Sequence, residues 1–267
     1  MNKLQKALLE MSELDRLTAM DSPVHRLSPL AKLLVTIVYI AVTVSFGKYD
    51  LSGLAVMVLY PVLGFTFSGI PVSTCFYKLR IAIPLVIFVG LFNPFFDKAP
   101  LLHIGNIVVS GGVVSMITLI LKGIFSLMAS FLLVATTPID SICAALRKLH
   151  VPSMLVTLLL LTFRYAGVLM QEAAVMSDAY RLRAPGQKGV HISAWGSFTG
   201  QLLLRSMDRA ERLYSSMQLR GFNGEFDYAG RIPFAMGDAL FLVICVAVFV
   251  LFRIFNFPDL LGGLFVR

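Results

Sequence analysis

The chain has 267 residues, of which 57% are hydrophobic and only 14% are charged, and its mean hydropathy is +0.82. Soluble domains are about half apolar and about a quarter charged, so this composition excludes an ordinary water-soluble globule. The apolar residues stand in long blocks, which predicts an all-α polytopic membrane protein. The net charge of +8 then indicates basic cytoplasmic loops, and nucleic acid is not expected as a partner.

Residues 1–29 are predicted to form an N-terminal interfacial segment. Within it, residues 1–21 place charges between leucines and methionines at near-helical spacing, and they are too charged for a signal peptide. We interpret them as an amphipathic helix at the membrane surface, with a plain solvated helix as the alternative. A polar segment containing Pro23 and Pro29 then leads to the first apolar block.

The apolar blocks predict about five transmembrane helices. Four of them fall within residues 30–135, at 30–46, 51–67, 81–96 and 107–135. The fifth lies at 234–252, within a final part that comprises the last span and the C-terminal tail, residues 234–267. Lys32, near the start of the first block, is expected to snorkel to the lipid headgroups.

Residues 136–233 are predicted to form coupling helices at the cytoplasmic face of the membrane. Pro138 supplies a fixed φ for a helix start. The apolar run 154–170 is ambiguous, because hydropathy alone would make it a span. If it crossed, eight basic residues between 171 and 233 would lie outside, against the positive-inside tendency. We therefore predict that this run lies along the cytoplasmic side and that the N-terminus is cytoplasmic.

Motifs that carry enzyme chemistry are absent from the sequence. There is no GxxxxGK[ST] loop for nucleotide phosphates, no HExxH and no GxSxG. The four histidines are far apart, and each of the three cysteines stands alone in apolar or amphipathic surroundings. We expect a non-catalytic protein with no cofactor, metal site or disulfide of its own.

The region 196–224 is typical of an amphipathic helix. Its apolar residues recur at steps of three and four, at Leu203, Met207, Ala210, Tyr214 and Met217. Charged residues occupy another face, where Asp208 is placed to pair with Arg205 and Arg212 along the helix.

Two helices are predicted to end in the same way, each at an arginine. Gly221 ends the helix in 196–224 and leaves Arg220 in its last turn, and Pro185 ends the preceding helix after Arg183. Either arginine alone would be read as compensation of the helix dipole. Two such ends favour guanidinium groups offered to a groove on a partner.

These motifs resemble a known family. The stretch 200–222 is similar to the signature of the transmembrane (T) component of energy-coupling factor transporters, particularly the CbiQ-type proteins of cobalt uptake. The segment 21–32, and Phe163-Arg164-Tyr165 followed by Glu172, are similar as well. The family's docking triplets usually read Ala-Arg-Ser or Ala-Arg-Gly. The matching residues are Leu182, Arg183 and Ala184, and Leu219, Arg220 and Gly221, with Arg181 as a competing register for the first triplet.

The resemblance implies a non-enzymatic scaffold in the bacterial or archaeal cytoplasmic membrane. It would hold two ABC-type ATPase subunits, which bind the ATP, against a small substrate-binding membrane component that takes up cobalt or nickel. Coupling or structural roles would belong to Arg164, Glu172, Arg205, Asp208, Arg209, Glu211 and Arg212. Arg164 is expected to pair with Glu172 or Asp178.

Two alternatives remain open at this point. One is a scaffold of the same type that serves a vitamin. The other is a self-contained channel or secondary carrier, for which Lys122 and Arg164 are the candidate interior charges.

Overall fold

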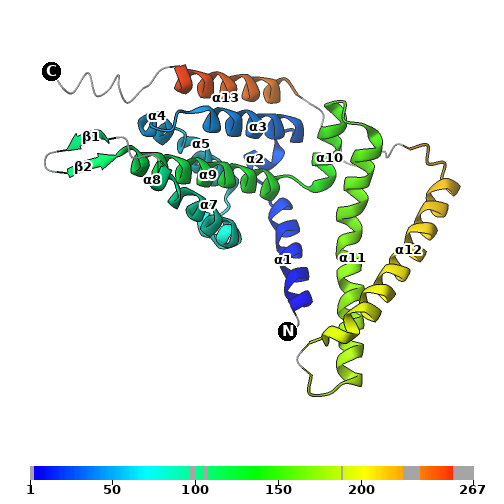
Figure 1. Ribbon diagram of the computed structural model, residues 1–267. Helices are drawn as coiled ribbons and strands as arrows, with labels where there is room; N and C mark the ends of the chain where they lie inside the picture. Colours follow the sequence, from blue (N-terminus) through cyan, green and yellow to red (C-terminus); the bar gives the residue numbers. More distant parts are fainter. Residues whose placement is uncertain (1–2, 97–99, 105–106, 188, 225–234, 255–267) are drawn as a thin grey trace. The chain divides into compact units, whose positions relative to one another are not determined.

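The computed structural model describes residues 3–96, 100–104, 107–187, 189–224 and 235–254. It divides the chain into two compact units (Figure 1). Unit 1 comprises Met1–Arg16 and Pro138–Arg231, and unit 2 comprises Leu17–Thr137 and Ile232–Arg267. The predicted helical membrane-protein fold is confirmed, whereas the division into four functional parts stays a prediction.

Unit 2 contains the five blocks predicted as membrane spans. Its described helices are α2 (Pro23–Arg26), α3 (Pro29–Ser45), α4 (Leu51–Val56), α5 (Leu59–Ser68), α6 (Val72–Lys78), η1 (Leu79–Ile81), α7 (Ala82–Leu91), α8 (Asn93–Phe96), α9 (Gly111–Thr136) and α13 (Met236–Ile254). Figure 1 shows α3 between α9 and α13. An aromatic cluster fills this core, with the ring centroids of Tyr39 and Tyr60 4.5 Å apart and Phe249 5.3 Å from each.

Two of the predicted blocks have different bounds in the structure. The third begins earlier, at Val72, and bends through η1, because Pro84 has no N–H to bond the carbonyl of Arg80. The first four residues of the fourth block are not helical but form strand β2 (Ile107–Ser110), which pairs antiparallel with β1 (Pro100–Ile104). The β-branched run in 107–109, preceded by Gly105 and Asn106 in the sequence, is a hairpin signal that outweighs its hydropathy.

Five stretches among the described residues are long and apolar enough to cross a membrane. They are Leu51–Ser68, Val72–Leu91, Gly111–Thr136, Ser153–Arg183 and Met236–Ile254. The first predicted span, α3, is shorter at 17 residues, about 25 Å at 1.5 Å per residue. This set includes Ser153–Arg183 and omits α3, so it differs from the five predicted spans. That residues 154–170 lie along the membrane stays a prediction.

Unit 1 is built on one long helix. Its described elements are α1 (Lys3–Thr18), α10 (Ile139–Lys148), α11 (Ser153–Arg183), η2 (Ile192–Ala194) and α12 (Trp195–Leu219), of which α1 runs on past the boundary of the unit. Cys143 on α10 is buried against Val156 and Leu160 of α11. Figure 1 shows α11 and α12 running in opposite directions, close together near the C-terminal end of α11 and apart at the other end. None of the 25 residues of α12 is buried.

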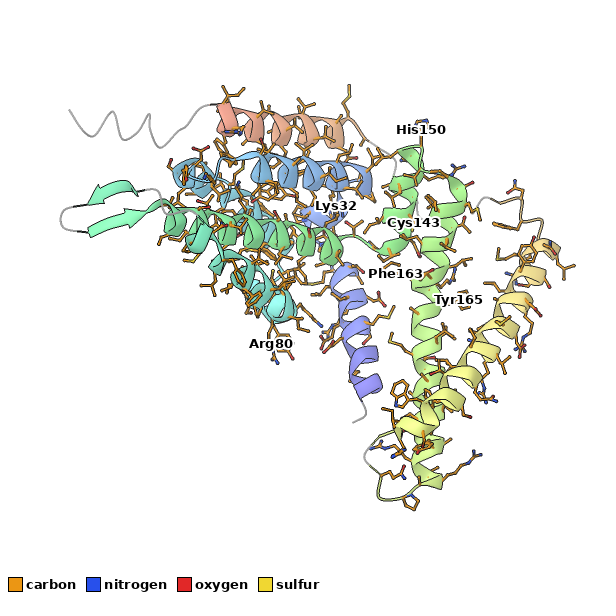
Figure 2. All side chains as sticks on the ribbon, in the orientation of Figure 1. Lys32, Arg80, Cys143, His150, Phe163 and Tyr165 are labelled. Carbon is orange, nitrogen blue, oxygen red and sulfur yellow. The ribbon has the colours of Figure 1, made fainter. Side chains whose placement is uncertain are left out.

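The turn between α10 and α11 depends on a residue in the left-handed region. His150 follows α10 with φ +63°, and its N–H donates to the carbonyl of Arg147 at 3.1 Å. The N–H of Val151 donates to the carbonyl of Leu146 at 3.2 Å, which completes a Schellman motif. Figure 2 shows His150 at this turn and Cys143 on α10.

Candidate functional site

The two helix ends predicted from Pro185 and Gly221 are present in the structure. α11 ends at Arg183, and residues Ala184 to Gln187 form a turn in which the N–H of Gln187 donates to the carbonyl of Ala184 at 3.4 Å. Gly186 occupies the left-handed position of that turn with φ +95°, as expected for Pro-Gly in a type II turn. A single proline therefore fixes where the first arginine stands.

α12 ends in a Schellman motif with Arg220 as its C-cap residue. Gly221 has φ +79° and donates from its N–H to the carbonyl of Gln218 at 2.9 Å, while Phe222 donates to the carbonyl of Met217 at 3.0 Å. Glycine at this place avoids the steric cost of a left-handed backbone. The side chain of Arg220 is exposed, as is that of Arg183.

Each of these arginines follows a leucine that the chain leaves almost wholly uncovered. Leu182 is 85% exposed and Leu219 is 90% exposed. Ala184 is half-buried and Gly221 is exposed. A leucine–arginine pair at a helix end combines an apolar side chain with a forked cation, and both groups are available to a partner.

The loop between α11 and α12 holds the start of α12 beside the end of α11. The hydroxyl of Tyr180 donates to Oε1 of Gln187 at 2.8 Å, and the N–H of His191 donates to the Tyr180 hydroxyl at 3.4 Å. η2 begins at the next residue and leads directly into α12. Arg183 therefore lies near the beginning of α12, and Arg220 lies at its far end.

Glu172 joins the two helices, and this overturns two predictions about its neighbours. Nη1 of Arg205 donates to Oε1 of Glu172, and Nη2 of Arg209 lies 3.9 Å from Oε2. The expected pair of Arg205 with Asp208 along α12 is therefore replaced by a bond between helices. The sequence also predicts that Arg164 pairs with Glu172 or Asp178, but among the described residues the carboxylate of Glu172 binds Arg205 and that of Asp178 lies beside Arg181.

Three further charged residues of this region are candidates from the sequence. Nε of Arg212 donates to the backbone carbonyl of Asp208 at 3.1 Å, not to its carboxylate. Nη1 of Arg181 lies 3.7 Å from Oδ1 of Asp178, one turn before it. Glu211 is exposed on α12.

Arg164 lines a cleft in unit 1. The cleft has a volume of about 490 Å³ and is bounded by α1, the start of α10 and the middle of α11. Asp15, Asp140 and Gln171 are other polar residues of its lining, and Phe163 belongs to its apolar wall. Figure 2 labels Phe163 and Tyr165 on this part of α11.

Unit 2 contains two lysines that stand inside apolar blocks of the sequence. Lys32 is 6% exposed, and its Nζ donates to the backbone carbonyl of Thr136 at 2.8 Å. The prediction that it snorkels to headgroups was wrong, because the open C-terminal end of α9 offers a carbonyl within reach. Nζ of Lys122 donates to the carbonyls of Val44, at 3.2 Å, and Phe46. Lys122 therefore contacts the C-terminal end of α3.

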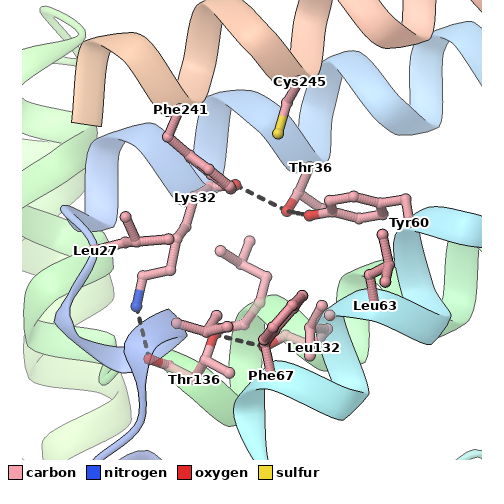
Figure 3. A pocket seen from close by; sticks show the side chains of 13 residues that line it. Leu27, Lys32, Thr36, Tyr60, Leu63, Phe67, Leu132, Thr136, Phe241 and Cys245 are labelled. Carbon is pink, nitrogen blue, oxygen red and sulfur yellow. Dashed lines mark hydrogen bonds between the residues drawn. The ribbon is translucent and has the colours of Figure 1, made fainter. Parts of the chain in front are cut away.

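Beside Lys32 there is an apolar cavity of about 200 Å³ (Figure 3). Residues of α3, α5, α9 and α13 line it, among them Tyr60, Phe67, Phe241 and Cys245. Oγ1 of Thr36 donates to the carbonyl of Lys32 at 2.8 Å, which leaves few polar atoms on the cavity wall. The cavity is a gap in the helix packing of unit 2.

The comparisons with known proteins identify a family. Residues 20–229 match the family described as CbiQ, cobalt transport protein. The cobalt transport protein CbiQ of Rhodobacter capsulatus is 26% identical over 253 residues, which is 91% of this chain and 98% of that protein. The energy-coupling factor transporter transmembrane protein EcfT of Lactococcus lactis subsp. cremoris is 26% identical over 219 residues, 76% of this chain and 82% of that protein.

A third relative covers less of the chain. The nickel permease LarQ of Lactiplantibacillus plantarum is 31% identical over 117 residues, which is 44% of this chain and 43% of that protein. The family match spans well over half of the 267 residues and includes both arginine-bearing helix ends. With apolar helices long enough to cross a bilayer several times, the chain is a multi-pass membrane protein that belongs to the CbiQ cobalt transport protein family.

Proposed function

We propose that this chain is the transmembrane scaffold subunit of an energy-coupling factor importer. In this role it couples ATP hydrolysis by two ABC-type ATPase subunits to uptake through a separate substrate-binding membrane component. The proposal is supported by the family match and by relatives named as energy-coupling factor transmembrane proteins.

The observation that carries the proposal is the pair of exposed leucine–arginine helix ends. Leu182 and Leu219 are more than four-fifths exposed, although burying a leucine side chain is favourable by about 1.5–3 kcal/mol. A groove on an ATPase would bury the leucine, and a carboxylate or carbonyl group in the groove would bind the arginine fork. The chain thus offers two copies of one docking element.

The placement of the two ends suits two separate ATPases. Arg183 lies near the start of α12 and Arg220 at its end, so the length of α12 separates them. That length is about 37 Å for 25 residues at 1.5 Å per residue. Two elements this far apart are suited to one groove on each of two globular subunits.

The substrate we propose is a divalent transition-metal cation, cobalt or nickel. Relatives are named for cobalt transport in Rhodobacter capsulatus and as a nickel permease in Lactiplantibacillus plantarum. Recognition of the ion is assigned to the separate membrane component, and ATP is bound by the ATPases. The subunit itself is proposed to be non-catalytic and without a cofactor.

We place the protein in the cytoplasmic membrane of a bacterium or archaeon, with its N-terminus and residues 136–233 on the cytoplasmic side. This orientation puts Arg183 and Arg220 where ATP is available. It also keeps the basic residues between 171 and 233 inside, in accord with the positive-inside tendency.

The test is co-purification of the complete complex from membranes in mild detergent. Arg183→Glu combined with Arg220→Glu is expected to abolish recovery of the ATPases and metal uptake while the chain stays in the membrane. Arg181→Glu is the matched control, because Arg181 is two residues from Arg183 but lies beside Asp178. Retention of the ATPases by the double variant, or their loss with Arg181→Glu alone, would contradict the assignment.

Transport by the purified chain alone is the second measurement. Proteoliposomes that contain only this subunit are expected to show no uptake of cobalt or nickel, and uptake is expected only with the ATPases and the substrate-binding component present. Uptake by the chain alone would identify a self-contained carrier instead.

A further inference from the structure

We infer that Glu172 is a positioning residue that sets the angle between α11 and α12, and with it the separation of Arg183 and Arg220. Its link to transport rests on the proposed function. The geometric part of the inference concerns this chain alone and can be tested without any partner.

The first step is that α12 is weakly attached to the rest of unit 1. None of its residues is buried, and Leu203, Leu204 and Met207 are each more than half exposed. Packing of apolar side chains therefore does little to fix the direction of this helix. Polar ties must carry much of that task.

The second step is that two such ties lie at different distances along the helices. One is the hydrogen-bonded loop at Tyr180 and His191, which holds the closed end of the pair. The other is the ion pair of Glu172 with Arg205 and Arg209. The contact of Tyr180 with His191 acts as a hinge. The ion pair of Glu172 with Arg205 and Arg209, here called the brace, holds the two helices together at a distance from this hinge.

The third step is the local environment of the brace. The side chain of Glu172 is 25% exposed, against 53% for Arg205 and 42% for Arg209. Glu172 is the least exposed member of the ion pair, and its neighbours on α11, Ala173, Ala174 and Ser177, are buried. The carboxylate of Glu172 accepts a charge-assisted hydrogen bond from Arg205 and forms an ion pair with Arg209. Because these groups are in part exposed, the bonds can also break and reform at small cost.

The fourth step is the lever that this geometry creates. From the start of α12 to Arg205 is 10 residues, about 15 Å, and to Arg220 is 25 residues, about 37 Å. On α11, Glu172 lies 11 residues, about 16 Å, from Arg183. A lengthening of the brace by about 2 Å therefore moves Arg220 by roughly 5 Å about the hinge. A small change in the length of the brace at Glu172 therefore produces a larger displacement of Arg220.

The test measures the distance between α11 and α12 directly. Spin labels are placed on cysteines introduced at the exposed positions Thr162 and Gln218, in the full chain in lipid nanodiscs. The three native cysteines are replaced by alanine in this background. Distances are measured by pulsed electron paramagnetic resonance for the parent, for Glu172→Gln and for the control Glu211→Gln.

Glu172→Gln is expected to shift the distance between the labels by on the order of 4 Å or to broaden its distribution, whereas Glu211→Gln leaves it unchanged. The charge exchange Glu172→Arg with Arg205→Glu is expected to restore the parent distance. An unchanged distance in Glu172→Gln would overturn the inference. Failure of the charge exchange to restore the distance would overturn it as well, because the effect of Glu172→Gln would then be local damage and not loss of an ion pair.

The link to transport is tested in the complete complex. The Glu172→Gln complex is expected to retain the ATPases but to take up metal at least about five-fold more slowly, a factor that corresponds to a coupling free energy of about 1 kcal/mol. Uptake is expected to recover in the charge-exchange variant. Unchanged uptake, or loss of the ATPases in parallel with uptake, would overturn the positioning role. If the Arg183 and Arg220 double variant keeps its ATPases, the proposed function fails, while the distance measurement still decides the geometric part.

Discussion

Lys32 of α3 donates a hydrogen bond from its Nζ to the backbone carbonyl of Thr136, the last residue of α9, at 2.8 Å. Lys122 of α9 does the same in return, with Nζ bonded to the carbonyls of Val44 and Phe46 at the end of α3. Each lysine of this antiparallel pair satisfies the open carbonyls of the other helix and opposes its dipole. The interval of 14 residues, about 21 Å, is the same on both helices, so both bonds specify one register.

Removal of either lysine is predicted to destabilise unit 2. Lys32→Met and Lys122→Met each leave helix-end carbonyls without a donor, which costs about 1–3 kcal/mol. At about 2–4 °C per kcal/mol, the thermal midpoint in detergent should fall by several degrees. Lys148→Met, at an exposed position on α10, is the control and should stay within about 0.5 kcal/mol. Equal midpoints for all three variants would contradict the capping role.

The turn at His150 is predicted to tolerate glycine better than histidine. The left-handed backbone at φ +63° costs a residue with a Cβ about 1 kcal/mol or more, which glycine avoids. His150→Gly should therefore keep or raise the thermal midpoint, and His150→Val should lower it. Gly221→Val, at φ +79° in the same kind of motif on α12, should also lose stability. A clear loss in His150→Gly would mean that the histidine side chain itself stabilises the turn.

The exposed leucines are predicted to matter for binding and not for folding. Leu182→Ser and Leu219→Ser remove side chains that the isolated chain leaves in water, so its stability should change by less than about 0.5 kcal/mol. Burial of each leucine in an ATPase groove contributes about 1.5–3 kcal/mol, so ATPase affinity should fall at least about ten-fold. Leu204→Ser, at a site 57% exposed in the middle of α12, is the matched control. ATPase affinity that is unchanged in all three variants would remove the leucines from the docking element.

The stability of the turn before α2 is predicted to depend on pH through one ion pair, that of Asp21 with Arg26. Arg26 donates from Nε to Oδ1 of Asp21 at 2.9 Å and from Nη2 to Oδ2 at 2.7 Å, and these bonds, together with its charge, hold the pKa of Asp21 below 3.8. Because the pKa of Asp21 is lower in the folded chain than in the unfolded chain, the ion pair stabilises the fold at pH values above the unfolded pKa. This stabilisation is lost as the pH falls through the folded pKa. Carboxyl carbon NMR in micelles should show the titration of Asp21 moving up in Arg26→Met. An unmoved titration would mean that the pair does not persist in solution.

The sequence was sufficient to predict features that depend on neighbours along the chain. Pro185 and Gly221 fix the ends of α11 and α12 because each acts on its own backbone, through a missing N–H or a left-handed φ. The apolar blocks likewise predicted the helices of unit 2, since hydropathy is a property of each segment. The roles of Arg183 and Arg220 in docking stay predictions.

Contacts between distant segments could not be predicted in this way. Helical spacing offers Asp208 as the partner of Arg205, but the structure gives Glu172, which is 33 residues away on another helix. Lys32 and Thr136 are 104 residues apart, so a membrane-facing lysine was the simpler expectation. In each case a contact between helices took the place of the expected partner, which was Asp208 for Arg205 and the lipid headgroups for Lys32. A single sequence without an alignment contains no signal for such pairs.

Because no residue of α12 is buried, this helix determines how readily the chain is degraded in the cell. A long helix with an uncovered apolar stripe is an early site of local unfolding and of attack by proteases. A subunit made without its partners should therefore be degraded from this helix first. Synthesis of the scaffold then needs to be matched to that of the proteins that cover it, and its abundance should rise and fall with theirs.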